Sequence, residues 1–196
     1  MSAAKALEKP LPRPRRGLVG YAAARALEAL LEALLALRFL GEGFTRSAAG
    51  KALQAWRALT GALPALERDR VAEKLENEEQ RRWLLEKAIP RAPTGRLKAL
   101  SQLLDEVGYR DYTHYTSTAL SLHDYQLHGP DPSGELSKYP GEEEARKDIV
   151  YLVQTVARVI GSKARQSLTE KGAWAPEHEE ALQRLAREIE SLGDGA

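Results

Sequence analysis

Apolar residues recur at three- and four-residue steps through most of this chain, and no segment alternates apolar and polar residues as a half-buried strand does. The clearest helical stripe falls in residues 17–40. Its members are Val19, Ala22, Ala23, Ala26, Leu27, Leu30, Leu31, Leu34, Leu35 and Leu37. Because this stripe is broad, we expect the helix to contact neighbours on two sides. So much apolar surface on one helix also suggests a homodimer.

A second helix is predicted from Phe44 or Thr45 to Leu63, where Pro64 should end it. The short glycine turn at residues 41–43 should fold the two helices into an antiparallel hairpin. Small side chains along the second helix should let its backbone approach the first closely. They are Ala48, Ala49, Gly50, Ala52, Ala55 and Ala58.

The rest of the chain is predicted to form further helices around one loop. The helices span residues 67–88, 94–107, 142–160, 163–170 and 176–192, and the Gly- and Pro-rich residues 129–141 form the loop. Thr94 should cap the second of these helices, and Gly161 should end the third. The predicted fold class is therefore all-α, an antiparallel up-and-down helical bundle with additional C-terminal helices.

Three regions are expected along the chain. Residues 1–16 combine basic side chains with prolines at positions 10, 12 and 14, which predicts a flexible, extended arm. Residues 17–162 should form the helical bundle. Residues 163–196 should be a C-terminal helical extension that packs on the bundle.

Composition narrows the functional classes. The chain has 29 basic and 28 acidic side chains, so it lacks the basic excess of a dedicated nucleic-acid binder, although a local basic patch remains open. It has no cysteine, which excludes disulfides and thiolate catalysis. Many Glu and Arg beside few thermolabile residues suggest a thermophilic source, and a GC-rich genome is the alternative. No signal-peptide core or membrane-length apolar stretch occurs, so we expect a cytoplasmic protein that does not enter a membrane.

Residues 109–129 hold three of the four histidines and four of the seven tyrosines. Drawn as a single helix, they have two faces. One face should be buried, and it carries Tyr112, Tyr115, Ala119, Leu122 and His123. The other is a polar row of Arg110, His114, Ser117, Ser121, Asp124, Tyr125 and His128. His123 is expected to be a core histidine with a hydrogen-bonded neighbour.

The polar row supplies the candidate site residues. Arg110, His114, Asp124, Tyr125 and His128 are the candidate ligand-binding residues, and Arg110, His114 and His128 are the catalytic candidates. Arg110 and His114 could meet as helical neighbours. His114 and Asp124 lie ten residues apart, about 15 Å along a helix, so they cannot share one ion. No nucleophile elbow, phosphate loop or HExxH motif occurs, and neither a metal nor a cofactor is expected.

Two segments together resemble a known family. FTRSAAGKALQAWRALTGAL (44–63) resembles the second helix of the archaeal PaREP proteins, and ALSLHDYQLHGPDP (119–132) resembles a later segment of theirs. That group is similar to HEPN domains, which are up-and-down helical bundles that often dimerise. The resemblance covers residues 17–162 and implies an HEPN-like bundle, a homodimer, and contact with a nucleotide or RNA. The matching residues are Lys51, Gln54, Trp56, His123, Tyr125 and Gly129, of which Trp56 and Gly129 have packing roles as the alternative.

The resemblance also bears on catalysis. Many HEPN domains are ribonucleases with an arginine followed by a histidine, but only three residues separate Arg110 from His114, fewer than the family pattern has. The first hypothesis is therefore a binding protein for a nucleotide, RNA or a partner protein, in a stress or toxin–antitoxin context. The second is a metal-independent ribonuclease that uses Arg110 with His114 or His128. The third is a purely structural assembly protein.

Overall fold

Two long helices form an antiparallel hairpin at the centre of the protein. The computed structural model describes residues 7–14 and 17–193, and the hairpin consists of α2 (Leu18–Gly41) and α3 (Thr45–Leu66). Gly43 makes the turn between them with a φ of +82°, a left-handed conformation that glycine adopts without strain. The predicted hairpin is confirmed.

Helix α3 continues past the residue predicted to end it. Pro64 lies inside the helix, two residues before Leu66. Proline removes one backbone donor, here the one that would reach the carbonyl of Thr60. The last turn still closes, because the Glu67 N–H donates to the Leu63 carbonyl at 2.9 Å. A single missing bond so close to the helix end does not stop the helix.

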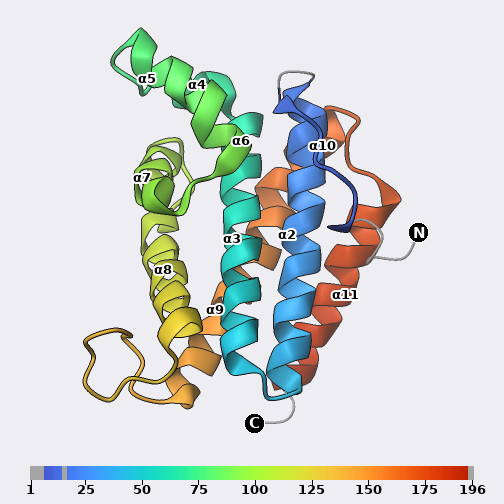
Figure 1. The fold of residues 1–196 in the computed structure, drawn as a ribbon. Helices are drawn as coiled ribbons and strands as arrows, with labels where there is room; N and C mark the ends of the chain where they lie inside the picture. The colour runs from blue at the N-terminus through green and yellow to red at the C-terminus, as the bar shows by residue number, and fades with distance from the viewer. Residues whose placement is uncertain (1–6, 15–16, 194–196) are drawn as a thin grey trace.

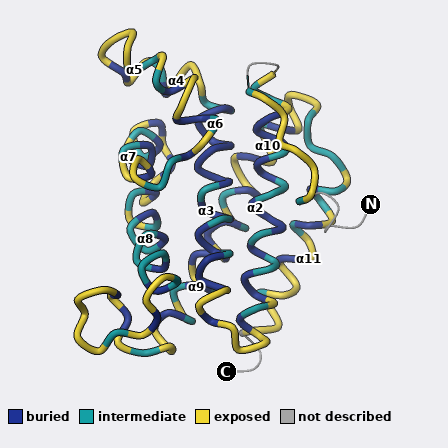
Figure 2. The backbone as a smooth tube through the Cα atoms, viewed as in Figure 1, coloured by how far each residue is buried: buried dark blue, intermediate teal, exposed yellow. Residues whose placement is uncertain are grey.

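Three further helices complete the bundle. They are α8 (Tyr112–His128), α9 (Glu142–Val159) and α11 (Pro176–Gly193). Helices α8 and α9 pack on α3 and on each other, and α11 packs on α2 and α9. Successive long helices run in opposite directions (Figure 1), and the buried residues lie along α3 and the sides that face it (Figure 2). The described residues contain no strand, so the all-α up-and-down bundle is confirmed.

The single helix predicted over residues 67–88 is wrong. This part of the chain is divided into α4 (Arg68–Ala72), α5 (Glu78–Trp83), a π-helical turn (Leu84–Ala88) and α6 (Ile89–Arg91). The break falls at Asn77, whose side chain accepts a hydrogen bond from the Gln80 N–H at 3.0 Å. Asparagine favours such a capping position over a helix interior, so it begins a new helix.

Two other boundaries differ from the prediction. Thr94 makes no side-chain cap and instead begins a 3-10 turn (Thr94–Arg96) that leads into α7 (Leu97–Glu106). Gly161 does not end the helix before it, which continues through a π-helical turn (Ile160–Ala164) into α10 (Arg165–Glu170). Glycine permits a helix end but does not require one. Continuation is stabilised here because it buries Ala164 and Leu168 in the core.

The broad apolar stripe of α2 is covered within the chain. Helices α3, α9 and α11 all pack against α2, so the stripe does not by itself call for a second copy. Helix α11 is also held by His178, whose Nδ1 accepts from the Ala175 N–H at 3.2 Å. Its Nε2 therefore donates to the Ala23 carbonyl, at 2.8 Å. Residues 7–14 of the predicted arm lie beside α2 (Figure 1). The rest of that arm, residues 1–6 and 15–16, falls outside the described residues.

Candidate functional site

Helix α8 begins later than the sequence suggests. Asp111 has a φ of +63°, a left-handed conformation that separates it from the helix. The Asp105 carboxylate, at the end of α7, accepts hydrogen bonds from the N–H groups of Tyr112 (2.8 Å) and Thr113 (3.0 Å). These bonds satisfy the first donors of α8 and fix its start at Tyr112.

Arg110 therefore lies in the turn before α8. The single helix predicted over residues 109–129 is wrong at its start, and Arg110 and His114 are not helical neighbours. Both side chains are exposed, and no hydrogen bond or ion pair joins them in the described part of the chain. The pairing on which the catalytic hypothesis rests is absent from this arrangement.

Below the start of α8, a group of aromatic rings fills the core. Trp56 of α3 stacks on Tyr112 with ring centroids 4.4 Å apart. The Tyr112 hydroxyl shares a hydrogen bond of 3.0 Å with the Thr60 hydroxyl, and burial raises the pKa of Tyr112 well above its usual range. Tyr109 meets Tyr112 edge to face at 6.3 Å. The predicted inward position of Tyr112 and the packing role of Trp56 are confirmed.

The aromatic group continues to the surface through Tyr115 of α8. Its ring centroid lies 6.0 Å from that of Trp56 on one side and 5.5 Å from that of Tyr151 on the other. Tyr151, on α9, is 46% exposed. The two hydroxyls are 3.5 Å apart, and this hydrogen bond raises the pKa of Tyr151 above its usual value. The exposed ring of Tyr151 thus packs against the half-buried ring of Tyr115.

Two basic groups border these rings. Arg158, two turns beyond Tyr151 on α9, donates to the Tyr115 hydroxyl at 3.2 Å and lies 5.7 Å from the centre of its ring. The His114 ring meets Tyr115 edge to face at 6.0 Å. We call His114, Tyr115, Tyr151 and Arg158 the tyrosine–arginine surface.

A second cation lies beyond Arg158 along the same helical run. Lys163, in the π-helical turn after α9, donates to the Gly108 carbonyl and lies 4.6 Å from the centre of the Tyr109 ring. In residues 7–14 and 17–193, neither Arg158 nor Lys163 has a carboxylate partner. Arg158 and Lys163 are therefore cations without an ion-pair partner among the described residues, in a protein whose net charge is only +1.

The remaining candidate residues lie at the other end of α8. Asp124 is half-buried and His128 is exposed. They are ten and fourteen residues beyond His114, about 15 and 21 Å along the helix. The predicted polar row therefore does not form one site, and only His114 among its members contacts the surface tyrosines.

Tyr125 does not belong to the exposed row. It is buried, and its ring meets that of Tyr139 edge to face at 5.5 Å. On the helix, Tyr125 lies at the edge of the predicted polar row. The loop that follows α8 returns to this point and covers Tyr125 with Tyr139. The predicted position of Tyr125 on the exposed polar row is wrong for this reason.

His123 also differs from the expectation. It is half-buried, and its Nδ1 is buried without a hydrogen-bond partner among the described residues. Three other residues matched by the resemblance have structural roles or contacts within the chain. Lys51 pairs with Glu32 at 2.9 Å, Gln54 accepts from Arg57 at 3.3 Å, and Gly129 ends α8 with a φ of +78°.

The described residues also bear on metal sites and membrane spans. In the described ranges, no group of three or more His, Cys, Asp or Glu side chains is placed to hold a metal ion. The helices of residues 7–14 and 17–193 include none with both the length and the apolar character of a membrane span.

The sequence contained a signal for the tyrosine–arginine surface. Tyr151 and Arg158 are seven residues apart, so they share the polar face of their helix. Their contact with Tyr115 depends on how α9 packs against α8, which the helix pattern does not specify.

Comparison with known proteins supports the resemblance. The family model described as the archaeal PaREP1/PaREP8 family matches residues 24–150. The matched segment starts within α2 and ends within α9, so it contains α3 and the whole of α8. Searches among curated proteins and solved structures find no match.

Proposed function

The chain belongs to the archaeal PaREP1/PaREP8 family, and we propose that it is a helical binding protein that binds single-stranded RNA without cleaving it. The similarity of this family to HEPN domains is what first implies contact with a nucleotide or RNA. The tyrosine–arginine surface is the part of the protein whose chemistry fits that ligand best.

A single observation carries the proposal, the exposed Tyr151 ring packed against Tyr115 beside Arg158. Unpaired bases stack on aromatic side chains, and every base offers such a face. The contact with Tyr115 limits the motion of the Tyr151 ring, so less conformational entropy is lost when a base stacks on it.

The two cations supply the complementary contact to the RNA backbone. Arg158 and Lys163 bond only to a hydroxyl, a carbonyl and aromatic rings in the described chain, so their charge is not neutralised by a carboxylate. Phosphates are attracted to such groups. With only two cations, we expect modest affinity and a shallow dependence on salt.

The arrangement favours binding over cleavage. General acid–base catalysis needs two groups within hydrogen-bond reach of one substrate. Arg110 lies in a turn outside α8, and the third catalytic candidate, His128, is at the opposite end of that helix from His114. The ribonuclease that uses Arg110 and His114 is therefore the alternative that the experiment must distinguish.

The experiment measures fluorescence anisotropy of a labelled oligouridylate titrated with the protein. Loss of one stacked base in Tyr151→Ala should weaken binding about fivefold to a hundredfold. Arg158→Ala should weaken binding and lower the slope of log K against log salt by about 0.7, the value for one phosphate on a single strand. Arg187→Ala, an exposed arginine on α11, is the matched control and should change neither.

Two other outcomes of this experiment would contradict the proposal. Unchanged affinity in Tyr151→Ala and Arg158→Ala would remove the proposed site. Wild-type protein that shortens the RNA, with cleavage lost in an Arg110→Ala, His114→Ala double variant, would establish the ribonuclease instead.

The family resemblance also leads us to propose a homodimer acting in a stress or toxin–antitoxin setting, and the composition and targeting analysis lead us to propose the cytoplasm of a thermophile. The chain mass is 21.7 kDa. Light scattering should give twice that mass at micromolar concentration, and the monomer mass would refute the dimer.

A further inference from the structure

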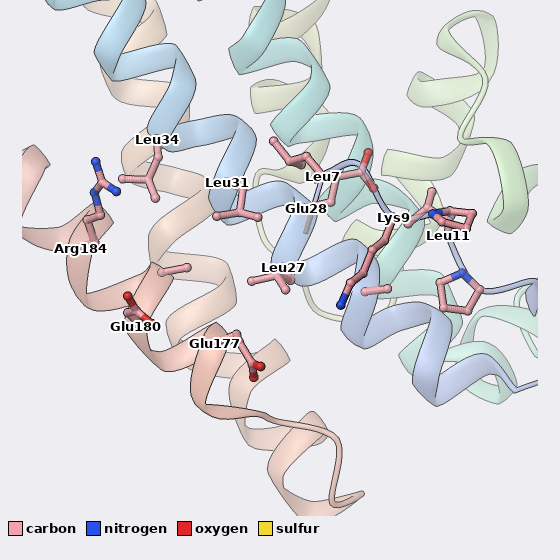
Figure 3. Close-up of a pocket in the computed structure, with 14 residues that line it drawn as sticks. Leu7, Lys9, Leu11, Leu27, Glu28, Leu31, Leu34, Glu177, Glu180 and Arg184 are labelled. Atoms are coloured by element: carbon pink, nitrogen blue, oxygen red, sulfur yellow. The ribbon is translucent and has the colours of Figure 1, made fainter. Parts of the chain in front are cut away.

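A pocket with an aliphatic lining lies between α2, α11 and the N-terminal segment of residues 7–12. Its volume is about 410 Å³. Leu27, Leu31 and Leu34 of α2 form one side, and α11 crosses beside them (Figure 3). We call it the α2–α11 pocket.

The lining favours an elongated apolar ligand. The α2 residues of the pocket run from Ala24 to Leu34, ten residues or about 15 Å of helix. Leu7 and Leu11 face them from the N-terminal segment, and Ala181 lies on α11. The volume falls within the range of about 300–1,000 Å³ that is usual for small-molecule sites.

The rim of the pocket is acidic on the α11 side. Three carboxylates and two cations line it, the cations being Lys9 and Arg184. Glu28 is paired with Arg25 at 2.6 Å, and Arg184 is paired with Glu188 at 3.6 Å.

The other two carboxylates have no such partner. Glu177 and Glu180 make no ion pair or side-chain hydrogen bond within the described residues. They are three residues apart on α11, and both line the pocket from that helix (Figure 3). Two carboxylates without an ion-pair partner beside an apolar lining attract a cation, because an opposite charge stabilises their ionised form.

The N-terminal segment that covers the pocket is weakly held. Over the part of the chain that the structure describes, no backbone hydrogen bond joins residues 7–12 to α2 or α11. Leu11 remains 42% exposed. A ligand can therefore enter without breaking backbone hydrogen bonds between this segment and the two helices.

The pocket is built largely from parts of the chain outside the family match. Residues 7–12 and α11 both lie beyond the matched segment of residues 24–150. Only the α2 side comes from within it. The site is thus separate from α8 and α9, and it does not depend on the RNA proposal.

From these observations we infer that the α2–α11 pocket binds a ligand with an aliphatic chain and a cationic head group, of the primary alkylamine class. The chain lies along Leu27, Leu31 and Leu34, and the ammonium group lies at Glu177 and Glu180. The N-terminal segment closes over the chain.

The test is calorimetric titration of the full-length protein with decylamine, decanol and decanoate below their aggregation concentrations. Decylamine should bind, decanol more weakly, and decanoate most weakly. A Glu177→Gln, Glu180→Gln double variant should weaken decylamine binding about twofold to thirtyfold, as expected from losing two surface ion pairs, and leave decanol binding unchanged. Glu190→Gln, exposed on the same helix, is the control and should have no effect.

A second variant tests the position of the aliphatic chain. Ala24→Leu fills part of the pocket and should weaken all three ligands, with circular dichroism confirming that the helices are intact. Equal binding of decanoate and decylamine, unchanged decylamine affinity in the double glutamine variant, or no binding of any of the three would each overturn the inference.

Discussion

The indole Nε1 of Trp56 donates a hydrogen bond of 2.9 Å to the hydroxyl of Thr116, and both side chains are fully buried. The same hydroxyl donates to the Tyr112 carbonyl at 2.9 Å, so its donor and an acceptor position are both used. This bond joins α3 to α8 directly beneath the tyrosine–arginine surface.

Trp56→Ala should destabilise the protein strongly. It removes a fully buried ring stacked on Tyr112 and leaves a cavity, a change that costs about 3–5 kcal/mol for large aromatic residues. Trp56→Phe keeps most of the packing and should cost less, because Thr116 retains its bond to the Tyr112 carbonyl. Denaturant unfolding followed by far-ultraviolet circular dichroism measures both. Equal losses in the two variants would mean that the hydrogen bond outweighs the packing.

Two glycines of α3 should respond differently to alanine. At Gly61 a methyl group would meet the Arg25 guanidinium at 3.0 Å and the Tyr21 hydroxyl at 3.3 Å. Arg25 is held there by Glu28 and by the Arg57 carbonyl, so it cannot move aside freely. Gly61→Ala should therefore lower the free energy of unfolding by about 1–3 kcal/mol.

At Gly50 the three atoms nearest to the methyl group would all belong to the amide end of Gln126, the first at 2.8 Å. That end belongs to a flexible side chain, and alanine favours the helix by up to about 1 kcal/mol over glycine. Gly50→Ala should thus be close to neutral. Thermal and denaturant unfolding of the two variants side by side gives the comparison, and a greater loss at Gly50 than at Gly61 would contradict it.

Stability should fall in alkaline solution. Burial raises the pKa of Tyr112 above its usual value of about 10, so the folded state keeps a proton that the unfolded state loses. The contribution of Tyr112 to the free energy of unfolding is fully present below about pH 10. It is lost as pH rises toward the pKa of the folded state, by up to about 1.4 kcal/mol per pH unit for one tyrosine. Tyr21, Tyr109 and Tyr139 act in the same direction.

Tyr112→Phe should reduce the slope of the free energy of unfolding against alkaline pH, because one proton fewer is released on unfolding. The substitution also removes the hydrogen bond to Thr60. Denaturant unfolding at a series of pH values from neutral to alkaline measures the slope in both proteins. An unchanged slope in Tyr112→Phe would show that Tyr112 titrates alike in the folded and unfolded states.

Helix existence could be predicted from the sequence more reliably than helix ends. The stripes of α2, α3, α9 and α11 follow from local periodicity, which is a property of neighbouring residues. Pro64 and Gly161 misled the prediction, because each allows a helix end that the surrounding packing did not favour. The break at residues 73–77 was missed because a single capping residue, Asn77, is a weak signal within an otherwise helical pattern.

The candidate site could be predicted only in part. The exposed position predicted for His114 agrees with the structure. The helical position predicted for Arg110 does not, because a helical wheel assumes helical backbone throughout and cannot show that Asp111 is left-handed. Tyr151 and Arg158 were missed because their significance depends on contact with Tyr115 of another helix. Periodicity gives the face on which a residue lies, and tertiary packing decides what that face meets.

The aromatic rings that run from Tyr109 through Tyr112, Trp56 and Tyr115 to Tyr151 have a spectroscopic consequence. Successive ring centroids are 6.3, 4.4, 6.0 and 5.5 Å apart, close enough for excitation absorbed by the tyrosines to pass to the indole. In a protein whose other two tryptophans are replaced by phenylalanine, the emission of Trp56 would therefore report on Tyr151. The fluorescence of the buried Trp56 would thus report on the exposed Tyr151 without an added label.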